Sequence, residues 1–165
     1  EASVAGMFTT NRVAAAPVLL DRLHLRHRLA RAIIVNSGNA NACTGTQGLA
    51  DAREMAALVA AQLQVPLHTV FVGSTGVIGQ PLPIAGIKRS LPALAARLRR
   101  SGGRAAARAI MTTDLRPKEV ALQTMISHRL VTLGGMAKGS GMIGDCPPGT
   151  VTRKARASAP SGREK

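Results

Sequence analysis

One stretch near the C-terminal end combines a single charged side chain with several glycines. Residues 134–143 read Gly-Gly-Met-Ala-Lys-Gly-Ser-Gly-Met-Ile, and Lys138 is the only charge among them. Gly139, Gly141 and Gly144 have the spacing G-x-G-x-x-G of a dinucleotide-binding turn. That turn must lead directly into a helix, whereas the prolines of residues 145–149 prevent one. A P-loop needs Gly-Lys-Ser rather than Lys-Gly-Ser. Both phosphate readings therefore fail, and a glycine-rich strand end is the simpler interpretation.

Two other polar stretches could also perform chemistry. Residues 73–81 contain three glycines, two hydroxyls and a proline directly after a β-branched run. Exposed backbone N–H groups in such a loop can form an oxyanion hole for acyl transfer. A plain strand-to-helix connection has the same composition. Residues 111–114, Met-Thr-Thr-Asp, place two hydroxyls and a carboxylate at a helix end, where they either bind a substrate or cap the helix.

A third polar stretch is rich in asparagine. Residues 36–43 contain three Asn, one Gly and one Ser directly after the buried-strand pattern of residues 32–35. Such residues are typical of loops, because their side chains bind nearby backbone groups. Amides at the end of a buried strand also bind polar ligands. Both interpretations stay open at this level.

The elements that position these stretches are expected to alternate between strands and helices. Short β-branched or apolar runs predict strands, and apolar residues at helical spacing predict helices. The strands are expected at residues 4–8, 32–35, 69–72, 120–126 and 130–133. The helices are expected at residues 14–29, 47–63, 84–100 and 104–110. There is no internal repeat, so the chain is predicted to be an α/β protein.

Composition limits the possible functions. The 165 residues suit one domain, and two Phe with no Trp or Tyr predict an aliphatic core. The net charge is +14 and the isoelectric point about 11.7, which suggests a nucleic-acid partner. However, the basic residues are spread along the chain without the aromatic side chains that stack on bases. Solvated basic faces are therefore favoured, and nucleic acid is not the expected partner.

Targeting signals and metal ligands are also missing from the pattern. Cys43 and Cys146 form no C-x-x-C motif, which favours a reducing compartment. No run approaches the ~20 apolar residues of a membrane span, and no signal peptide is evident. The four His lack metal-ligand spacing. We expect a cytoplasmic protein with no metal, no resident cofactor and no membrane partner. The chain begins with Glu1 rather than Met, as expected for a segment of a longer protein.

Five stretches occur together in an order found in one enzyme family. They are Phe8-Thr9-Thr10-Asn11-Arg12, Val35-Asn36-Ser37-Gly38-Asn39-Ala40-Asn41-Ala42, Gly73-Ser74-Thr75-Gly76-Val77-Ile78-Gly79, Met111-Thr112-Thr113-Asp114 and Ala137-Lys138-Gly139-Ser140-Gly141-Met142-Ile143. Over residues 1–143 the chain resembles the α-chain region of the ornithine acetyltransferase family, the bifunctional glutamate N-acetyltransferases of arginine biosynthesis. The resemblance implies a layered α-β-β-α sandwich like that of N-terminal nucleophile hydrolases, incomplete in this chain.

The resemblance also implies roles for particular residues. Thr75 and Gly76 match the oxyanion-hole pair, and Thr112 and Lys138 match substrate-binding positions. The implied substrates are N-acetylornithine and glutamate, with acetyl-CoA as a further acetyl donor in bifunctional members. The family precursor cleaves itself at an Ala-Thr bond, and the freed Thr becomes the nucleophile that carries the acetyl group. The implied partner is the β chain of the same precursor, in an α2β2 heterotetramer.

The chain departs from the family pattern after residue 143. By the family's spacing the nucleophile would fall at Gly149, and the nearby Thr150 follows Gly rather than Ala. Residues 144–165 are a basic Pro, Gly and Ser-rich segment expected to be disordered. We expect a truncated or frame-disrupted member that is inactive alone. The alternatives are a basic, non-catalytic nucleic-acid binder and a partner subunit whose Thr comes from a separate β chain.

Overall fold

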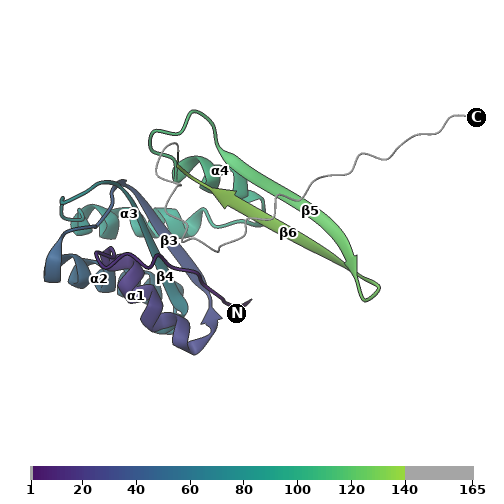
Figure 1. Ribbon diagram of the computed structural model, residues 1–165, viewed down its shortest axis with the longest axis horizontal. Coiled ribbons are helices and arrows are strands. Elements are labelled where there is room, and N and C mark those ends of the chain that lie inside the picture. Colours follow the sequence, from purple (N-terminus) through teal and green to yellow (C-terminus); the bar gives the residue numbers. More distant parts are fainter. Residues whose placement is uncertain (1, 140–165) are drawn as a thin grey trace, which may run out of the picture.

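The computed structural model describes residues 2–139, which form a mixed α/β structure (Figure 1). The strands are β1 (Ala2–Ser3), β2 (Leu29–Ala30), β3 (Ala32–Asn39), β4 (Val70–Val77), β5 (Lys118–Ile126) and β6 (Arg129–Ala137). The helices are α1 (Ala16–His24), α2 (Gly45–Leu63), α3 (Ile84–Ala96) and α4 (Gly103–Ala109), with 3-10 turns η1 (Leu25–His27), η2 (Leu67–Thr69) and η3 (Arg100–Gly102). The expectations for Cys146, Thr150 and residues 144–165 lie outside the described residues.

The parallel pair β3 and β4 organises the first half of the chain. The register runs from Ala32 opposite Val70 to Asn39 opposite Val77. Two parallel strands need a long crossover, which α2 provides. Helices α1, α2 and α3 cover one face of the pair, where Ile34 and Val72 are buried, whereas Ile33 on the other face is 72% exposed. The other face is thus open along β3, although Phe71 of β4, the register partner of Ile33, is only 6% exposed.

The core between these helices and strands is aliphatic, as the composition predicts. Met55, Ala52 and Ala56 of α2 are completely buried, and Val70 lies against them in the same cluster. The alanines let α2 approach the sheet closely, and Met55 fills the irregular space that remains. The long apolar stripe predicted for residues 47–63 is therefore confirmed as a core helix.

Several predicted boundaries were wrong for identifiable reasons. Both β3 and β4 continue through polar stretches predicted as loops, because the two strands pair residue by residue as far as Asn39 and Val77. Residues 4–8 do not form the predicted strand. The Val4 N–H reaches the Arg28 carbonyl at 3.1 Å, and the chain then leaves the short β1–β2 ladder. The predicted helix of residues 14–29 ends early, because Arg28 has a left-handed φ of 55°.

The free edge of β4 is closed by side chains of α1. The Val72 N–H donates to Asp21 Oδ1 at 3.0 Å, and His24 Nδ1 lies 2.7 Å from the Val70 carbonyl oxygen. These two backbone groups would otherwise be available to another strand, and such open edges favour aggregation. Burial raises the pKa of Asp21 to about 6, although the hydrogen bond from Val72 acts in the opposite direction.

Replacing Asp21 by asparagine should alter the pH dependence of stability. The native pKa of Asp21 lies above the unfolded value, so the native state binds more protons and stability falls as pH rises from about 4 to about 6. The asparagine side chain keeps an acceptor for Val72 without the buried charge. Because Asp21 is only partly buried, solvent screening reduces the effect, and urea unfolding should show that Asp21→Asn gains roughly 1–2 kcal/mol at neutral pH and little at pH ~4. Glu54→Gln on the exposed face of α2 is the control. An equal effect of Asp21→Asn at both pH values would contradict the argument.

The hairpin β5–β6 extends away from the helices (Figure 1). Its two-residue turn consists of Ser127 and His128, with φ of 49° and 60°, the backbone of a tight hairpin turn. Side chains lie exposed on both faces of the ribbon, and the opposed pair Leu122 and Leu133 is 58% and 67% exposed. A two-stranded ribbon is marginally stable in water, so this apolar surface is suited to being covered.

Self-association through the hairpin is the expected behaviour of the chain by itself. Leu122→Lys with Leu133→Glu places opposite charges on neighbouring strands and removes the apolar pair. Sedimentation should show association of the wild-type chain and a clear shift towards monomer in this double variant. Leu115→Lys is the matched control, because Leu115 is 97% exposed outside the hairpin. A wild-type chain that is monodisperse at high concentration would contradict the prediction.

Candidate functional site

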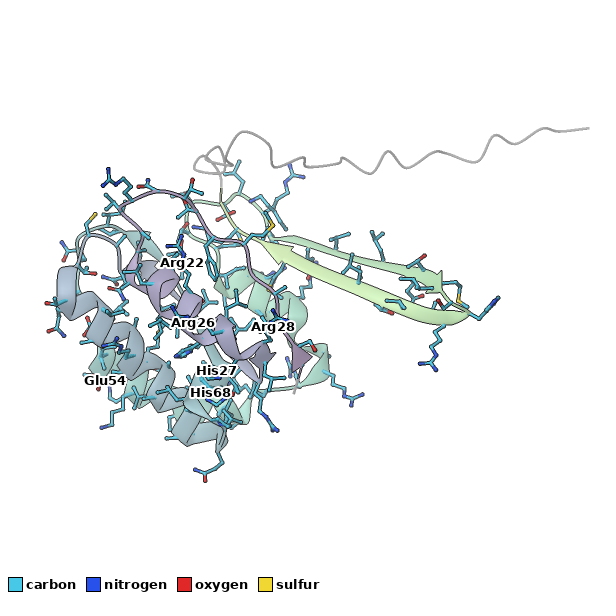
Figure 2. The ribbon with its side chains drawn as sticks, turned by 60° about the horizontal axis from the view of Figure 1, so that its bottom comes forward. Arg22, Arg26, His27, Arg28, Glu54 and His68 are labelled. Atoms are coloured by element: carbon cyan, nitrogen blue, oxygen red, sulfur yellow. The ribbon has the colours of Figure 1, made fainter. Side chains whose placement is uncertain are left out.

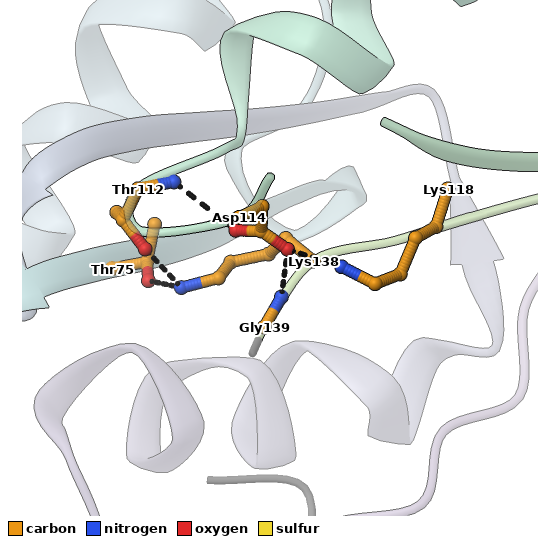
Figure 3. A network of polar contacts seen from close by, with 6 residues as sticks. All are labelled: Thr75, Thr112, Asp114, Lys118, Lys138 and Gly139. Carbon is orange, nitrogen blue, oxygen red and sulfur yellow. Dashed lines mark hydrogen bonds and ion pairs between the residues drawn. The ribbon is translucent and has the colours of Figure 1, made fainter. Parts of the chain in front are cut away.

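The ammonium group of Lys138 brings together three residues from distant parts of the chain (Figure 3). Its Nζ donates to Thr75 Oγ1 at 2.5 Å and to Thr112 Oγ1 at 2.9 Å. Thr75 lies on β4, Thr112 in the turn after α4, and Lys138 directly after β6. The structure thus gathers three of the four residues to which the family resemblance assigns roles. Two hydroxyls and a cation at one point form a polar site suited to an anionic group.

Gly76, the fourth of these residues, follows Thr75 where β3 and β4 come closest. It lies opposite Gly38 in the parallel register and has φ of +133°. A Cβ at Gly76 would lie 2.2 Å from both the carbonyl carbon and the oxygen of Gly38. Only glycine fits this close approach of two backbones. The position of the Thr75 backbone therefore depends on a pair of glycines in neighbouring strands.

The turn that carries Thr112 is fixed to β3 by Ser37, a member of the asparagine-rich stretch to which the sequence analysis gave no role of its own. Ser37 Oγ donates to the Met111 carbonyl at 2.7 Å. Ser37 also lies opposite Thr75 in the register. No local pattern could have marked Ser37, because its role follows from a contact across 74 positions.

Asp114 lies beneath the site rather than facing into it. Its side chain is completely covered, and its carboxylate accepts from Lys118 Nζ at 2.5 Å and from the Gly139 N–H at 2.6 Å. The hydrogen bond from Lys118, followed by that from Gly139, holds the pKa of Asp114 well below its usual range. Within residues 2–139, the ion pairs join Arg104 to Glu119 and Lys118 to Asp114. Lys138 forms no ion pair with a carboxylate of this part of the chain.

The amides of the asparagine-rich stretch bind the protein itself. The buried Asn41 donates to the Gly48 carbonyl at 2.9 Å and accepts from Thr44 Oγ1 at 2.7 Å. Further hydrogen bonds connect Asn36 Nδ2 with the Asn39 carbonyl (2.8 Å), Ser74 Oγ with Asn36 Oδ1 (2.6 Å) and Asn39 Nδ2 with the Pro81 carbonyl (3.1 Å). Of the two interpretations open from the sequence, the structural one fits these contacts.

A cavity of about 260 Å³ lies between β3, α2 and α3. Its lining includes Asn36, Ser37, Asn39, Met55, Ile87 and Leu91. It therefore has a polar side near the Thr112 turn, through Ser37, and an apolar side towards the core. A cavity of mixed character beside a polar cluster is typical of a small-molecule site.

A second hollow, of about 660 Å³, lies between residues 4–6 and the segment formed by α1 and η1, and its lining is basic. Arg22 of α1, Arg26 of η1 and Arg28 directly after η1 line it, and Figure 2 shows them together with His27 and His68. The rings of His27 and His68 stack with centroids 4.2 Å apart. The three arginines favour anions, and the partly exposed ring of Phe8 lies 5.8 Å from the Arg22 guanidinium.

Among residues 2–139, none of the helices combines the length and apolar character needed to cross a membrane. In the same range, His, Cys, Asp and Glu side chains do not gather in groups of three or more that could hold a metal ion.

Comparisons with known proteins agree on one family. The family model described as the ArgJ family matches residues 1–147. A protein of Thermosynechococcus vestitus named arginine biosynthesis bifunctional protein ArgJ is 51% identical over 143 residues, which is 86% of this chain and 34% of that protein. A protein of the same name from Caldanaerobacter subterraneus is 48% identical over 142 residues, 86% of this chain and 35% of that protein.

Two solved structures are similar in fold. The crystal structure of the arginine biosynthesis bifunctional protein ArgJ from Bacillus halodurans has a TM-score of 0.80 at 42% identity, covering 88% of this chain and 76% of that chain. The ornithine acetyltransferase of Mycobacterium tuberculosis, complexed with ornithine, has a TM-score of 0.83 at 43% identity, with 88% and 78% covered. The chain spans about a third of the length of the curated relatives.

Proposed function

The chain belongs to the ArgJ family, and on that premise we propose that it supplies part of the active site of a glutamate N-acetyltransferase. The reaction moves the acetyl group of N-acetylornithine to glutamate in arginine biosynthesis. The Mycobacterium tuberculosis relative, an ornithine acetyltransferase complexed with ornithine, supports this substrate class. The names of the curated relatives support the pathway.

One observation carries the proposal: the Lys138 ammonium lies against two hydroxyls without a carboxylate partner in the described part of the chain. Both substrates are amino acids with an α-carboxylate. An ammonium with no neutralising carboxylate binds such a group as a point charge, and the Thr112 hydroxyl offers a further hydrogen bond. The Thr75–Gly76 backbone then lies beside the bound substrate, where its N–H groups are suited to the oxyanion.

The proposed chemistry needs a threonine that the family supplies downstream. Its hydroxyl oxygen attacks the acetyl carbonyl carbon of N-acetylornithine while its own α-amine takes the proton. The tetrahedral intermediate collapses, the C–N bond breaks, and ornithine leaves with the proton. The glutamate amine then attacks the acetyl-threonine ester and restores the hydroxyl. No resident cofactor takes part, and acetyl-CoA is an alternative donor in bifunctional members.

Division of the precursor into two chains is part of the proposal. This chain covers about a third of the curated relatives but about three quarters of each crystallised chain. The crystallised chains are therefore less than half as long as the curated proteins. This difference supports self-cleavage into α and β chains, assembled as α2β2 in a layered α-β-β-α sandwich. The exposed hairpin and the open face of β3 give the β chain an apolar surface to cover.

We place the acetyltransferase domain at residues 1–143, close to the end of the family match at residue 147, and treat the remainder up to residue 165 as a segment outside that domain. The chain alone is then inactive, because its nucleophile is missing. As a biosynthetic enzyme it would work in the cytoplasm. Purified chain should show no transfer from N-acetylornithine to glutamate. Turnover that disappears on Thr150→Ala would overturn this assignment.

The direct experiment supplies the nucleophilic threonine and the β-chain segment from a relative. Residues 1–143 are joined to the segment that follows in the Thermosynechococcus vestitus relative, and acetyl transfer is measured. The proposal predicts transfer by the chimera, with release of an N-terminal threonine. A folded and cleaved chimera without transfer would contradict it. Reading the coding DNA beyond residue 143 in all frames separately tests the frame-disruption hypothesis.

The basic hollow supports one alternative, a non-catalytic binder of nucleic acid. Arg26 and Arg28 are exposed and line the hollow, and no ion pair with a described carboxylate occupies them. Phosphate contacts give binding that weakens steeply with salt. A salt titration of duplex DNA binding, compared between wild type and Arg26→Gln with Arg28→Gln, tests this alternative. Equal salt slopes would exclude the hollow as the binding surface.

A further inference from the structure

We propose that Asp114 is a positioning residue of the site, whose carboxylate fixes Lys138 and Thr112 relative to each other. The family resemblance assigns roles to Thr75, Gly76, Thr112 and Lys138, but none to Asp114. The inference rests on the proposed function only for the meaning of the Lys138–Thr112 contact. Its physical content is a hydrogen-bonded link between two segments, which can be tested without any catalytic assay.

The link is visible in Figure 3, where one carboxylate binds the backbone on both sides of the site. Asp114 Oδ1 accepts from the N–H of Gly139, the residue directly after Lys138, at 2.6 Å. Oδ2 accepts from the N–H of Thr112 at 3.2 Å. The side chains of Lys138 and Thr112 meet at 2.9 Å. The Asp114 carboxylate thus holds the backbone of Thr112 and the backbone directly after Lys138.

The link matters because Lys138 and Gly139 lie beyond the strand ladder. The pairing of β5 and β6 ends where Lys118 lies opposite Ala137. Gly139 has φ of +127°, which turns the chain away from the strand direction. Beyond the last ladder pair, the hydrogen bond from the Gly139 N–H to Asp114 therefore attaches this segment to the rest of the protein. Without the carboxylate, the segment that carries Lys138 loses this attachment.

Lys118 stabilises the carboxylate in place. A covered carboxylate without a cation would be costly, and Lys118 Nζ lies 2.5 Å from Asp114 Oδ1. The two lysines near the site therefore have separate tasks. Lys118 neutralises Asp114, whereas Lys138 keeps its charge for the ligand. A carboxylate that contacted substrate would need an exposed face, and the side chain of Asp114 has none.

Competitive lysine labelling separates positioning from mere charge balance. The full chain is treated with a limiting amount of an acetylating N-hydroxysuccinimide ester, and each lysine is quantified by peptide mass spectrometry. In Asp114→Asn the rate of Lys138 labelling, relative to Lys88 of α3, should rise roughly fivefold as the segment is released. Lys118→Met should raise that rate less than Asp114→Asn does, because Asp114 loses its cation but still binds both N–H groups.

The controls make each outcome decisive. Asp51→Asn removes another buried carboxylate, which binds Gln47 on α2, and should leave Lys138 labelling unchanged. Unchanged Lys138 labelling in Asp114→Asn, or an equal rise in Lys118→Met, would overturn the inference. If Asp114→Asn does not fold, hydrogen exchange of the Gly139 amide in the wild-type chain tests the link instead. A protected Gly139 amide supports the link, and an unprotected one overturns it. Failure of the acetyl-transfer chimera would refute the proposed function and leave this result standing.

Discussion

Replacing Gly76 by alanine should prevent the β3–β4 pair from forming in its native register. The added Cβ would lie 2.2 Å from the backbone carbon and oxygen of Gly38, which cannot move without breaking the ladder. The φ of +133° adds strain that a side chain rarely tolerates. We expect a loss of at least about 3 kcal/mol in the free energy of unfolding, a large part of the stability of a domain. Urea unfolding followed by circular dichroism measures it.

Gly38→Ala is the matched control for this variant. Gly38 also has a positive φ, +124°, but a Cβ there would meet nothing within 4 Å. The control thus carries the backbone strain without the clash, and it should lose only about 1–2 kcal/mol. If the two variants lose the same stability, the close approach of the strands is not what requires glycine at position 76.

The second large effect is expected at Asn41, the completely buried amide of the asparagine-rich stretch. Asn41→Leu keeps the branching of the side chain but is larger, and it removes the hydrogen bond to the Gly48 carbonyl and the hydrogen bond from Thr44 Oγ1. It also places a bulky residue at φ of 49°. Unsatisfied buried groups cost about 1–3 kcal/mol each, so we expect the free energy of unfolding to fall by roughly 3–5 kcal/mol.

The contrast with Asn39 tests why Asn41 matters. Asn39→Ala removes one hydrogen bond of 3.1 Å to the Pro81 carbonyl from a partly exposed side chain. It should cost about 1 kcal/mol or less. If Asn41→Leu is as mild as Asn39→Ala, the stretch is not held by its buried amide. In that case a ligand-binding role for the asparagines would regain support.

Local sequence patterns were enough to predict the helices and strands that depend mainly on interactions between residues close in sequence. Helix α2 was placed nearly correctly, and strands were expected at residues 120–126 and 130–133, although β6 extends to Ala137. Apolar periodicity and short apolar runs act over a few neighbouring positions. The lengths of β3 and β4 were not predictable in this way. Asn36 and Gly73 belong to polar stretches that favour loops, and only the partner strand makes them extended.

The residues of the site were likewise predictable from the sequence, whereas their contacts were not. The family resemblance pointed to Thr75, Gly76, Thr112 and Lys138, and the structure brings the three side chains into contact. Single-sequence reasoning could not show that contact, since it spans 63 positions between Thr75 and Lys138. Asp114 was visible in the sequence as one residue of a polar run with two possible roles. Its covered position and its bond to Gly139 required the structure.

The central claim is that Lys138 is a substrate-binding residue of an acetyl-transfer site. The most direct measurement is the rate of acetyl transfer from N-acetylornithine to glutamate by the chimera, compared with the same chimera carrying Lys138→Met. We expect the substitution to lower kcat/KM roughly 10- to 100-fold, the loss typical of a charged contact with substrate. A chimera whose kcat/KM is unchanged by Lys138→Met would contradict the account.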